Sequence, residues 1–317
     1  MQRSYHSLLP IVVIVGWLLM SPAAMLAQDV PASSELAASE NPLDLIKDYK
    51  GERINFNLDI AAFKLYDAPG AEIEVYYDIP NTALVFKEIA SGELATTLII
   101  AVRILDKEGA VVKQAANRGS TRVKNQKEAK DPMLSSKFVS AFNLDPGTYV
   151  FKVGVKDNLS CKIGVQEKEF EVKSLAKDEL GTSSIEFATD VEKPKLGEDS
   201  GFLKETLNVL VTPHPSRTYR LGDTLSVYFN IYNLMVDNSK RPRFKITYKF
   251  KREGDKRIMR KIVDGERVAG SNQSHLYSFD ITEKNRFKVG NYTLFIKVTD
   301  KLGNRAVEMK EAFKVAK

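Results

Sequence analysis

Histidine and cysteine, which often serve as metal ligands, bases or nucleophiles, are scarce in this sequence. The chain of 317 residues has one cysteine and three histidines, namely Cys161, His6, His214 and His275. No pair of them has the spacing of a metal site, and there is no Cys-x-x-Cys, no Gly-x-Ser-x-Gly and no glycine-rich phosphate loop. We therefore expect no catalytic residue, no cofactor, no metal and no intramolecular disulfide. A hydrolase with dispersed active-site residues remains an alternative, because the members of a catalytic triad need not be close in sequence.

Two aspartates, Asp157 and Asp300, occupy matching places at the ends of predicted strands. A calcium site needs six or more oxygen ligands, and no nearby loop has that density of acidic residues. Aspartate is also a common turn residue, because its short side chain accepts hydrogen bonds from neighbouring backbone N–H groups. We predict that both aspartates cap turns.

Basic residues are concentrated in one stretch, residues 240–261. The formal net charge of the chain is +6, whereas this stretch has eleven basic and two acidic residues, a net charge of +9. Such a concentration predicts a surface for an anionic partner, either an envelope protein or an acidic glycan. Nucleic acid is not expected as a partner, because residues 1–27, described below, have the features of an export signal. The alternative is structural, because lysine on an edge strand prevents edge-to-edge aggregation. The candidate surface comprises Lys245, Lys249, Lys251, Arg252, Lys256, Arg257, Arg260 and Lys261.

The elements that position these side chains are predicted to be β-strands. Apolar and polar residues alternate from residue 244 to residue 251, which places Lys245, Lys249 and Lys251 on one face of a strand. A turn signal at residues 253–255 then brings Arg260 and Lys261 onto a neighbouring strand. Residues 71–79 show the same alternation, and no long segment has helical periodicity. An all-β fold of short strands and frequent turns is therefore expected.

An internal repeat indicates two copies of one fold. Residues 147–159 match residues 290–302, and the match continues without a gap to Val172 and Val315. Residues 75–79 match residues 227–231 at a slightly larger offset, so the first copy has the longer middle segment. We predict two tandem immunoglobulin-like β-sandwich domains, in which Tyr149 and Tyr292 are core or corner residues. The predicted domains are residues 50–175 and 206–317, joined by an inter-domain segment at residues 176–205.

The first 27 residues have the features of a secretory signal peptide. Arg3 precedes an apolar stretch at residues 8–20, and small residues then offer cleavage after Ala23 or Ala27. An uncleaved anchor is the alternative, but the stretch is shorter than the roughly 20 residues that span a bilayer. We therefore expect a periplasmic or extracellular protein with no transmembrane span in the mature chain. Residues 28–49 are expected to be a linker that ends in a short helix with Asn41 as its N-cap.

Four segments carry a resemblance to a known family: Phe-Lys-Leu-Tyr at residues 63–66, Glu-Val-Tyr-Tyr-Asp-Ile-Pro at 74–80, Ser-Ser-Ile-Glu-Phe-Ala at 183–188 and Leu-Ser-Val-Tyr-Phe-Asn-Ile-Tyr-Asn-Leu at 225–234. They resemble the β-rich regions of exported bacterial proteins named for a GWxTD motif, and the likeness covers most of residues 52–316. The Gly-Trp-x-Thr-Asp motif itself is absent, since the only tryptophan is Trp17. The resemblance implies export and sandwich modules, and it implies no reaction.

These observations predict an exported, non-enzymatic binding or scaffold protein of the bacterial cell envelope. A carbohydrate-binding protein is one alternative, and coplanar exposed tyrosines would favour it. A converging Ser, His and Asp cleft would favour the hydrolase. A broad charged or apolar patch would favour a protein or polyanion partner.

Overall fold

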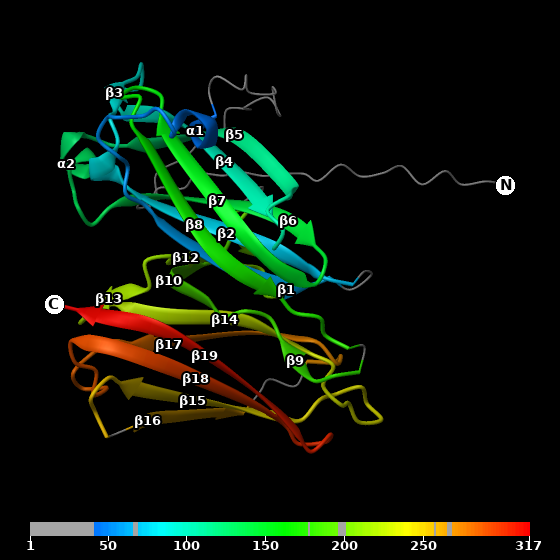
Figure 1. The fold of residues 1–317 in the computed structure, drawn as a ribbon. Helices are drawn as coiled ribbons and strands as arrows, with labels where there is room; N and C mark the ends of the chain where they lie inside the picture. Colours follow the sequence, from blue (N-terminus) through cyan, green and yellow to red (C-terminus); the bar gives the residue numbers. More distant parts are fainter. Residues whose placement is uncertain (1–40, 66–68, 177, 196–200, 257, 265–267) are drawn as a thin grey trace. The chain divides into compact units, whose positions relative to one another are not determined.

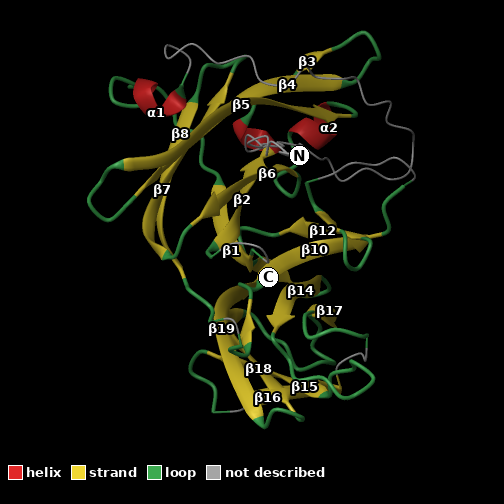
Figure 2. Ribbon diagram, turned by 90° about the vertical axis from the view of Figure 1, so that its right-hand side faces the viewer, coloured by secondary structure: helices red, strands yellow, loops and turns green. Residues whose placement is uncertain are grey.

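The computed structural model describes residues 41–65, 69–176, 178–195, 201–256, 258–264 and 268–317 (Figure 1). Strands account for 58% and helices for 4%, so the protein is all-β, as predicted (Figure 2). The expected signal peptide and residues 28–40 of the expected linker lie outside the described residues. In the described part of the chain, no helix has the length and apolar character of a membrane span.

The chain divides into two compact units. Unit 1 comprises Met1–Ile60 and Asp67–Lys173, and unit 2 comprises Ala61–Tyr66 and Ser174–Lys317. The expected first domain, residues 50–175, is therefore not one continuous segment, because residues 61–66 group with unit 2.

Unit 1 contains two sheets and two short helices, Pro42–Leu45 (α1) and Gln126–Ala129 (α2). One sheet has the order β1-β2-β6, and the other has the order β3-β4-β7-β8 with β5 on the second side of β4. On β2, Ile73, Val75 and Tyr77 are fully buried as the alternation predicts, but Tyr76 and Asp78 are buried as well, so the second half of the strand is covered on both faces. A short 3-10 turn, Asn81–Ala83, follows β2. The strands are Asn57–Lys64 (β1, of which residues 61–64 group with unit 2), Ala71–Pro80 (β2), Lys87–Glu88 (β3), Leu94–Leu105 (β4), Val111–Val123 (β5), Ser135–Leu144 (β6), Gly147–Asp157 (β7) and Ile163–Val172 (β8).

The helix α1 begins where the sequence predicts, with the Asn41 side chain accepting a hydrogen bond from the backbone N–H of Leu43 at 2.9 Å. It ends at Leu45 and does not continue to Tyr49 as expected. Pro42 and Leu43 are buried over β7, where they fill the space that a side chain at Gly154 would need. The last part of the expected linker is therefore a packed part of unit 1.

Unit 2 is a pair of sheets around one continuous core. One sheet has the order β11-β12-β10-β14-β17 with β9 also on β14, and the other has the order β13-β19-β18-β15-β16. Both contribute to the core, for example through Phe229 of β14, Tyr248 of β15 and Ile296 of β18. The strands are Gly181–Thr182 (β9), Glu186–Glu192 (β10), Leu203–Lys204 (β11), Val209–Pro213 (β12), Thr218–Arg220 (β13), Thr224–Tyr232 (β14), Phe244–Arg252 (β15), Ile258–Asp264 (β16), Gln273–Asp280 (β17), Gly290–Asp300 (β18) and Arg305–Ala316 (β19).

The expectation that residues 176–205 form an inter-domain segment is wrong. They contain β9, β10 and β11, and β10 lies between β12 and β14 in the sheet. Ile185 and Phe187 of this segment belong to the core of unit 2. These strands could not be recognised from the sequence. β9 and β11 have two residues each, and the apolar residues of β10 give way to polar ones at Asp190.

The internal repeat corresponds to equivalent strands. The bounds of β7 and β18 are shifted by the same 143 positions, from Gly147–Asp157 to Gly290–Asp300. The order β5-β4-β7-β8 in unit 1 corresponds to β16-β15-β18-β19 in unit 2, and β1-β2-β6 corresponds to β10-β14-β17. The two units thus share a strand order in both of their sheets.

The tyrosines and aspartates of the repeat have matching roles. The hydroxyl of Tyr149 donates to the carbonyl of Asp145 at 3.0 Å, and the hydroxyl of Tyr292 donates to the carbonyl of Lys288 at 2.9 Å, so each ties a strand to the turn before it. Asp157 accepts from the N–H of Leu159 and Asp300 from that of Leu302, which confirms the predicted turn caps. Burial opposes ionisation of Asp300, yet donated hydrogen bonds hold its pKa below the ordinary value.

A buried ion pair fastens β11 to β10 within unit 2. The ammonium of Lys204 lies 2.8 Å from the carboxylate of Glu186, and the two side chains are 5% and 1% exposed. The same ammonium lies over two aromatic rings, 4.9 Å from the centre of Phe63 and 5.2 Å from that of Tyr228. The charge is therefore compensated by a carboxylate and by two aromatic faces.

Candidate functional site

The hairpin of β15 and β16 has the orientation that the sequence predicts. Phe244, Ile246, Tyr248 and Phe250 are at most 4% exposed and belong to the core of unit 2. The lysines of β15 alternate with them and so lie on the opposite, outer face of the sheet. The charged side chains of β15 therefore lie on the outer face of the sheet, and its apolar side chains pack against the core from the inner face.

Strand register extends this charge across four neighbouring strands (Figure 1). Arg260 of β16 is opposite Lys249 of β15, Lys249 is opposite Phe295 of β18, and Phe295 is opposite Lys310 of β19. Side chains of directly opposite residues share a face and have Cβ atoms about 5 Å apart. Three cations and one half-buried aromatic ring therefore form a row across the outer face.

Further lysines flank this row. Lys245 precedes the row and Lys251 follows it along β15, and Lys297 follows it along β18. Lys297 forms an ion pair with Glu308 at 2.9 Å, and Asp264 pairs with Lys301 at 3.0 Å. We call the following set the cationic face: Lys245, Lys249, Lys251, Arg260, Phe295, Lys297 and Lys310.

The central cations of the cationic face form no close ion pair with any residue that the structure describes. Among the described residues, no carboxylate lies within 4.0 Å of the charged groups of Lys249, Lys251, Arg260 or Lys310. The hydrogen bond and charge of Lys297 lower the pKa of Glu308, and the charge of Lys249 lowers it further. The positive charges of the face therefore favour the ionised form of Glu308. Such a concentration of like charge costs stability unless an anion screens it.

The structure separates the other predicted residues from the cationic face. Lys261 is opposite Tyr248 and so lies on the inner side of β16, where it is exposed because β16 is an edge strand. Arg252 donates to the carbonyl of Val289 and lies 3.8 Å from Asp255. Lys256 is an exposed residue of the turn, and Arg257 lies outside the described residues. Four of the eight predicted residues therefore lie on the face: Lys245, Lys249, Lys251 and Arg260.

Sequence reasoning missed Phe295, Lys297 and Lys310. They belong to β18 and β19, far along the chain from the basic stretch. The alternation Leu294-Phe295-Ile296-Lys297-Val298 shows that residues 295 and 297 face away from the core. What the sequence did not supply is the strand order that places β18 beside β15.

The two histidines that the structure describes, His214 and His275, have structural partners. Nε2 of His214 lies 2.8 Å from the carbonyl oxygen of Thr218, which only accepts, so Nε2 holds a proton and does not take one from Ser216 at 3.1 Å. Nε2 of His275 lies 2.6 Å from the hydroxyl of Tyr248 inside unit 2. Cys161 is exposed. In the described part of the chain, no three His, Cys, Asp or Glu residues group closely enough to hold a metal ion.

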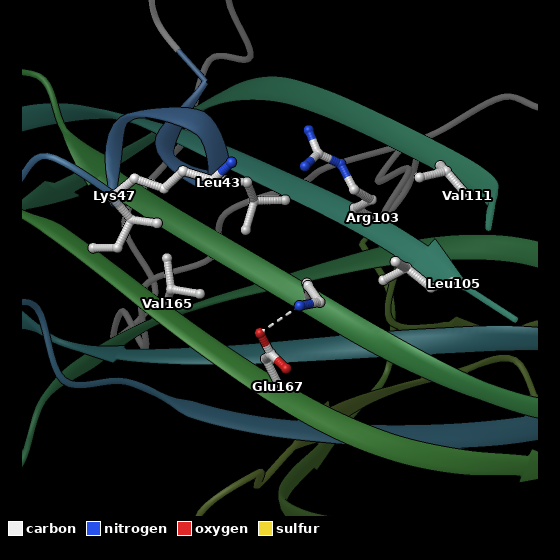
Figure 3. Close-up of a pocket in the computed structure, with 9 residues that line it drawn as sticks. Leu43, Lys47, Arg103, Leu105, Val111, Val165 and Glu167 are labelled. Carbon is white, nitrogen blue, oxygen red and sulfur yellow. Dashed lines mark ion pairs between the residues drawn. The ribbon is translucent and has the colours of Figure 1, made fainter. Parts of the chain in front are cut away.

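A shallow depression lies on the surface of unit 1 (Figure 3). It has a volume of about 360 Å³ and lies beside α1 on the outer side of β4, β7 and β8. Its walls combine aliphatic with charged side chains, and the ion pair of Lys152 and Glu167 at 2.8 Å crosses it. No aromatic side chain lines it, and no Phe, Tyr or Trp of the described residues is among the exposed large side chains.

Comparisons with known proteins do not assign a family. No protein-family model matches the chain, and no curated protein matches it. Among solved structures, the chain is similar to a red sea bream transglutaminase, with 10% identity and a TM-score of 0.23 over 90% of this chain and 34% of that one. It is also similar to a Bacteroides uniformis beta-glucuronidase 2, with 8% identity and a TM-score of 0.26 over 78% of this chain and 26% of that one. The chain spans about a third and a quarter of their lengths, and a likeness this weak carries no argument about function.

Proposed function

We propose that this is an exported, non-enzymatic binding or scaffold protein of the bacterial cell envelope. In this proposal the cationic face docks an anionic envelope partner, an acidic protein or an acidic glycan. The observation that carries it is the row of Arg260, Lys249, Phe295 and Lys310, whose cations have no carboxylate partner among the described residues. Edge protection alone needs charge only on β16, whereas this charge extends inward to β18 and β19.

We further infer that both units are immunoglobulin-like sandwiches, which the shared strand order and the two corner tyrosines support. Export is supported by the signal-like composition of residues 1–27 and by the resemblance to GWxTD-type proteins. The mature protein should be periplasmic or extracellular, with an amino terminus created by cleavage after a residue between 23 and 27. Mass spectrometry of the purified native protein tests this. Recovery from the cytosol with residue 1 or 2 at its terminus would refute export.

The docking proposal is tested by removing charge from the cationic face. A variant with serine at Lys249, Lys251, Arg260 and Lys310 should lose partners captured by crosslinking in intact cells. A matched control loses four exposed charges from unit 1, with serine at Lys113, Lys124, Lys127 and Lys130, and should keep them. Equal folding of the two variants is checked by circular dichroism.

Salt dependence provides the second readout. Binding of dextran sulfate to the purified full chain should weaken by about tenfold or more between 0.1 and 1 M NaCl, because the Debye length falls from about 10 Å to about 3 Å. The face variant should bind it weakly at either salt concentration. If the face variant retains every crosslinked partner and binds dextran sulfate like the control, the lysines are only a solvated surface.

A further inference from the structure

The cationic face ends at an open sheet edge. β16 is the last strand of its sheet, and among the described residues only β15 pairs with it. It is neither short nor bulged, and its seven residues pair with β15 in continuous register. The side of β16 away from β15 is called the open edge below.

Hydrogen bonds of β15 identify which backbone groups the open edge presents. The N–H of Glu253 donates to Asn291 and the N–H of Lys301 donates to Arg243, so odd-numbered residues of β15 direct their backbone groups toward β18. Backbone direction alternates along a strand, so even-numbered residues of β15 bond to β16. Their partners are Met259, Lys261 and Val263. The N–H and C=O groups of the other residues of β16 therefore point outward from the open edge, in particular those of Ile258, Arg260 and Ile262.

The side chains of these three residues lie on the cationic face. Ile258 and Ile262 are 54% and 45% exposed, and Arg260 is between them. In an antiparallel hydrogen-bonded pair, opposite residues also share a face. A strand added antiparallel at the open edge would therefore place every second side chain on the outer face, with one of them opposite Arg260 and its neighbours on that face opposite Ile258 and Ile262.

Charge selects the occupant of the open edge. A second copy of this chain would bring Arg260, Lys249 and Lys251 of both molecules together, and such like charges repel. An extended segment with acidic residues at alternate positions would instead place a carboxylate opposite Arg260, on the same face as Lys249 and Lys251. The arrangement discourages self-association and admits an acidic strand.

We propose that the open edge of β16 binds an extended acidic polypeptide segment by antiparallel strand addition, with its alternate acidic side chains on the cationic face. This inference rests on the docking function proposed above. It specifies a protein partner and makes its main-chain amides part of the recognition.

The test uses the purified full chain and a labelled peptide, acetyl-Glu-Val-Glu-Val-Glu-Val-Glu-amide. The peptide should bind, and N-methylation of its glutamate amides should weaken binding by about tenfold or more, because those amides would donate to β16. Fluorescence anisotropy measures both affinities at one salt concentration. Dextran sulfate, which has charge and no amides, reports on the cationic face alone.

A proline variant tests the protein side. In Ile262→Pro every cation is kept, but an outward N–H is lost and a ring is placed on the edge, a position where strands tolerate proline. It should lose peptide binding and retain dextran sulfate binding, whereas Ile262→Thr should retain both. If the proline variant does not fold, the comparison of methylated and unmethylated peptide on the natural sequence decides.

The outcomes separate the two proposals. Three results would overturn strand addition and leave the docking function intact. They are equal binding of the methylated and unmethylated peptides, full peptide binding by Ile262→Pro, and dextran sulfate binding with no peptide binding. Failure of both probes to bind, or no effect of the four serine substitutions on either, would overturn the docking function and strand addition with it.

Discussion

His275 should make the stability of unit 2 depend on pH. Its imidazole is half-buried, packs 5.3 Å from the ring of Phe229 and lies beside Tyr248. Burial lowers the pKa of His275 to about 4 from the ordinary 6.5. The unfolded chain takes up a proton near pH 6.5, whereas the folded chain does so only near pH 4. Stability conferred by the neutral imidazole should therefore be lost as the pH falls from 6.5 toward 4.

The size of this loss follows from the shift in pKa. A shift of one unit corresponds to about 1.4 kcal/mol, so the full window is worth roughly 3 kcal/mol. This is an upper value, because the side chain is partly exposed. For a unit of this size, about 3 kcal/mol lowers the melting temperature by roughly 10 °C.

The assay compares the full chain with His275→Gln by scanning calorimetry at several pH values between 7.5 and 4.5. Glutamine can still exchange a hydrogen bond with Tyr248 but does not titrate. The carboxylates are common to both proteins, so their contribution cancels in the difference. The advantage of the natural chain over the variant in the unit 2 transition should shrink as the pH falls. A difference that stays constant across this range would show that the imidazole is not held neutral by burial.

Two further substitutions address packing. Tyr292→Ala should lower the free energy of unfolding by about 3–5 kcal/mol, since Tyr292 is 3% exposed. Tyr149→Ala should lower it by less, because Tyr149 is only half-buried. Urea titration of both variants checks that Tyr292→Ala is the more destabilising substitution. Lys204→Met should cost about 3–5 kcal/mol by leaving the buried Glu186 without its ammonium, and combining it with Glu186→Leu should restore most of the loss. Equal stability of the single and double variants would contradict this account.

The sequence predicts those features that depend on local periodicity. The alternation in β15 correctly separates Phe250 from Lys251, and the repeat correctly relates β7 to β18. Asn41 and Pro42 likewise locate the start of α1, because capping is a local interaction.

Features that depend on partners distant in sequence were not predictable in this way. Lys310 lies on the cationic face because β19 is beside β18. Lys261 lies on the other side of the sheet because the register places it opposite Tyr248. The strands at residues 181–204 were not predicted, because their own alternation of apolar and polar residues is too short to detect. They form by pairing with strands that are distant in sequence.

The position of β19 has a consequence for the speed of folding. β19 forms a local hairpin with β18 across residues 301–304, but on its other side it pairs in parallel with β13, where Thr218 is beside Lys314. That pairing closes a loop of most of unit 2, and the entropy of closure is lost before the contacts can compensate for it. Non-local pairing of this kind is typical of domains that fold on the order of milliseconds to seconds. The hairpin of β18 and β19 should therefore form early, and the docking of β13 against it should be a late step that completes the core around Tyr219 and Phe313.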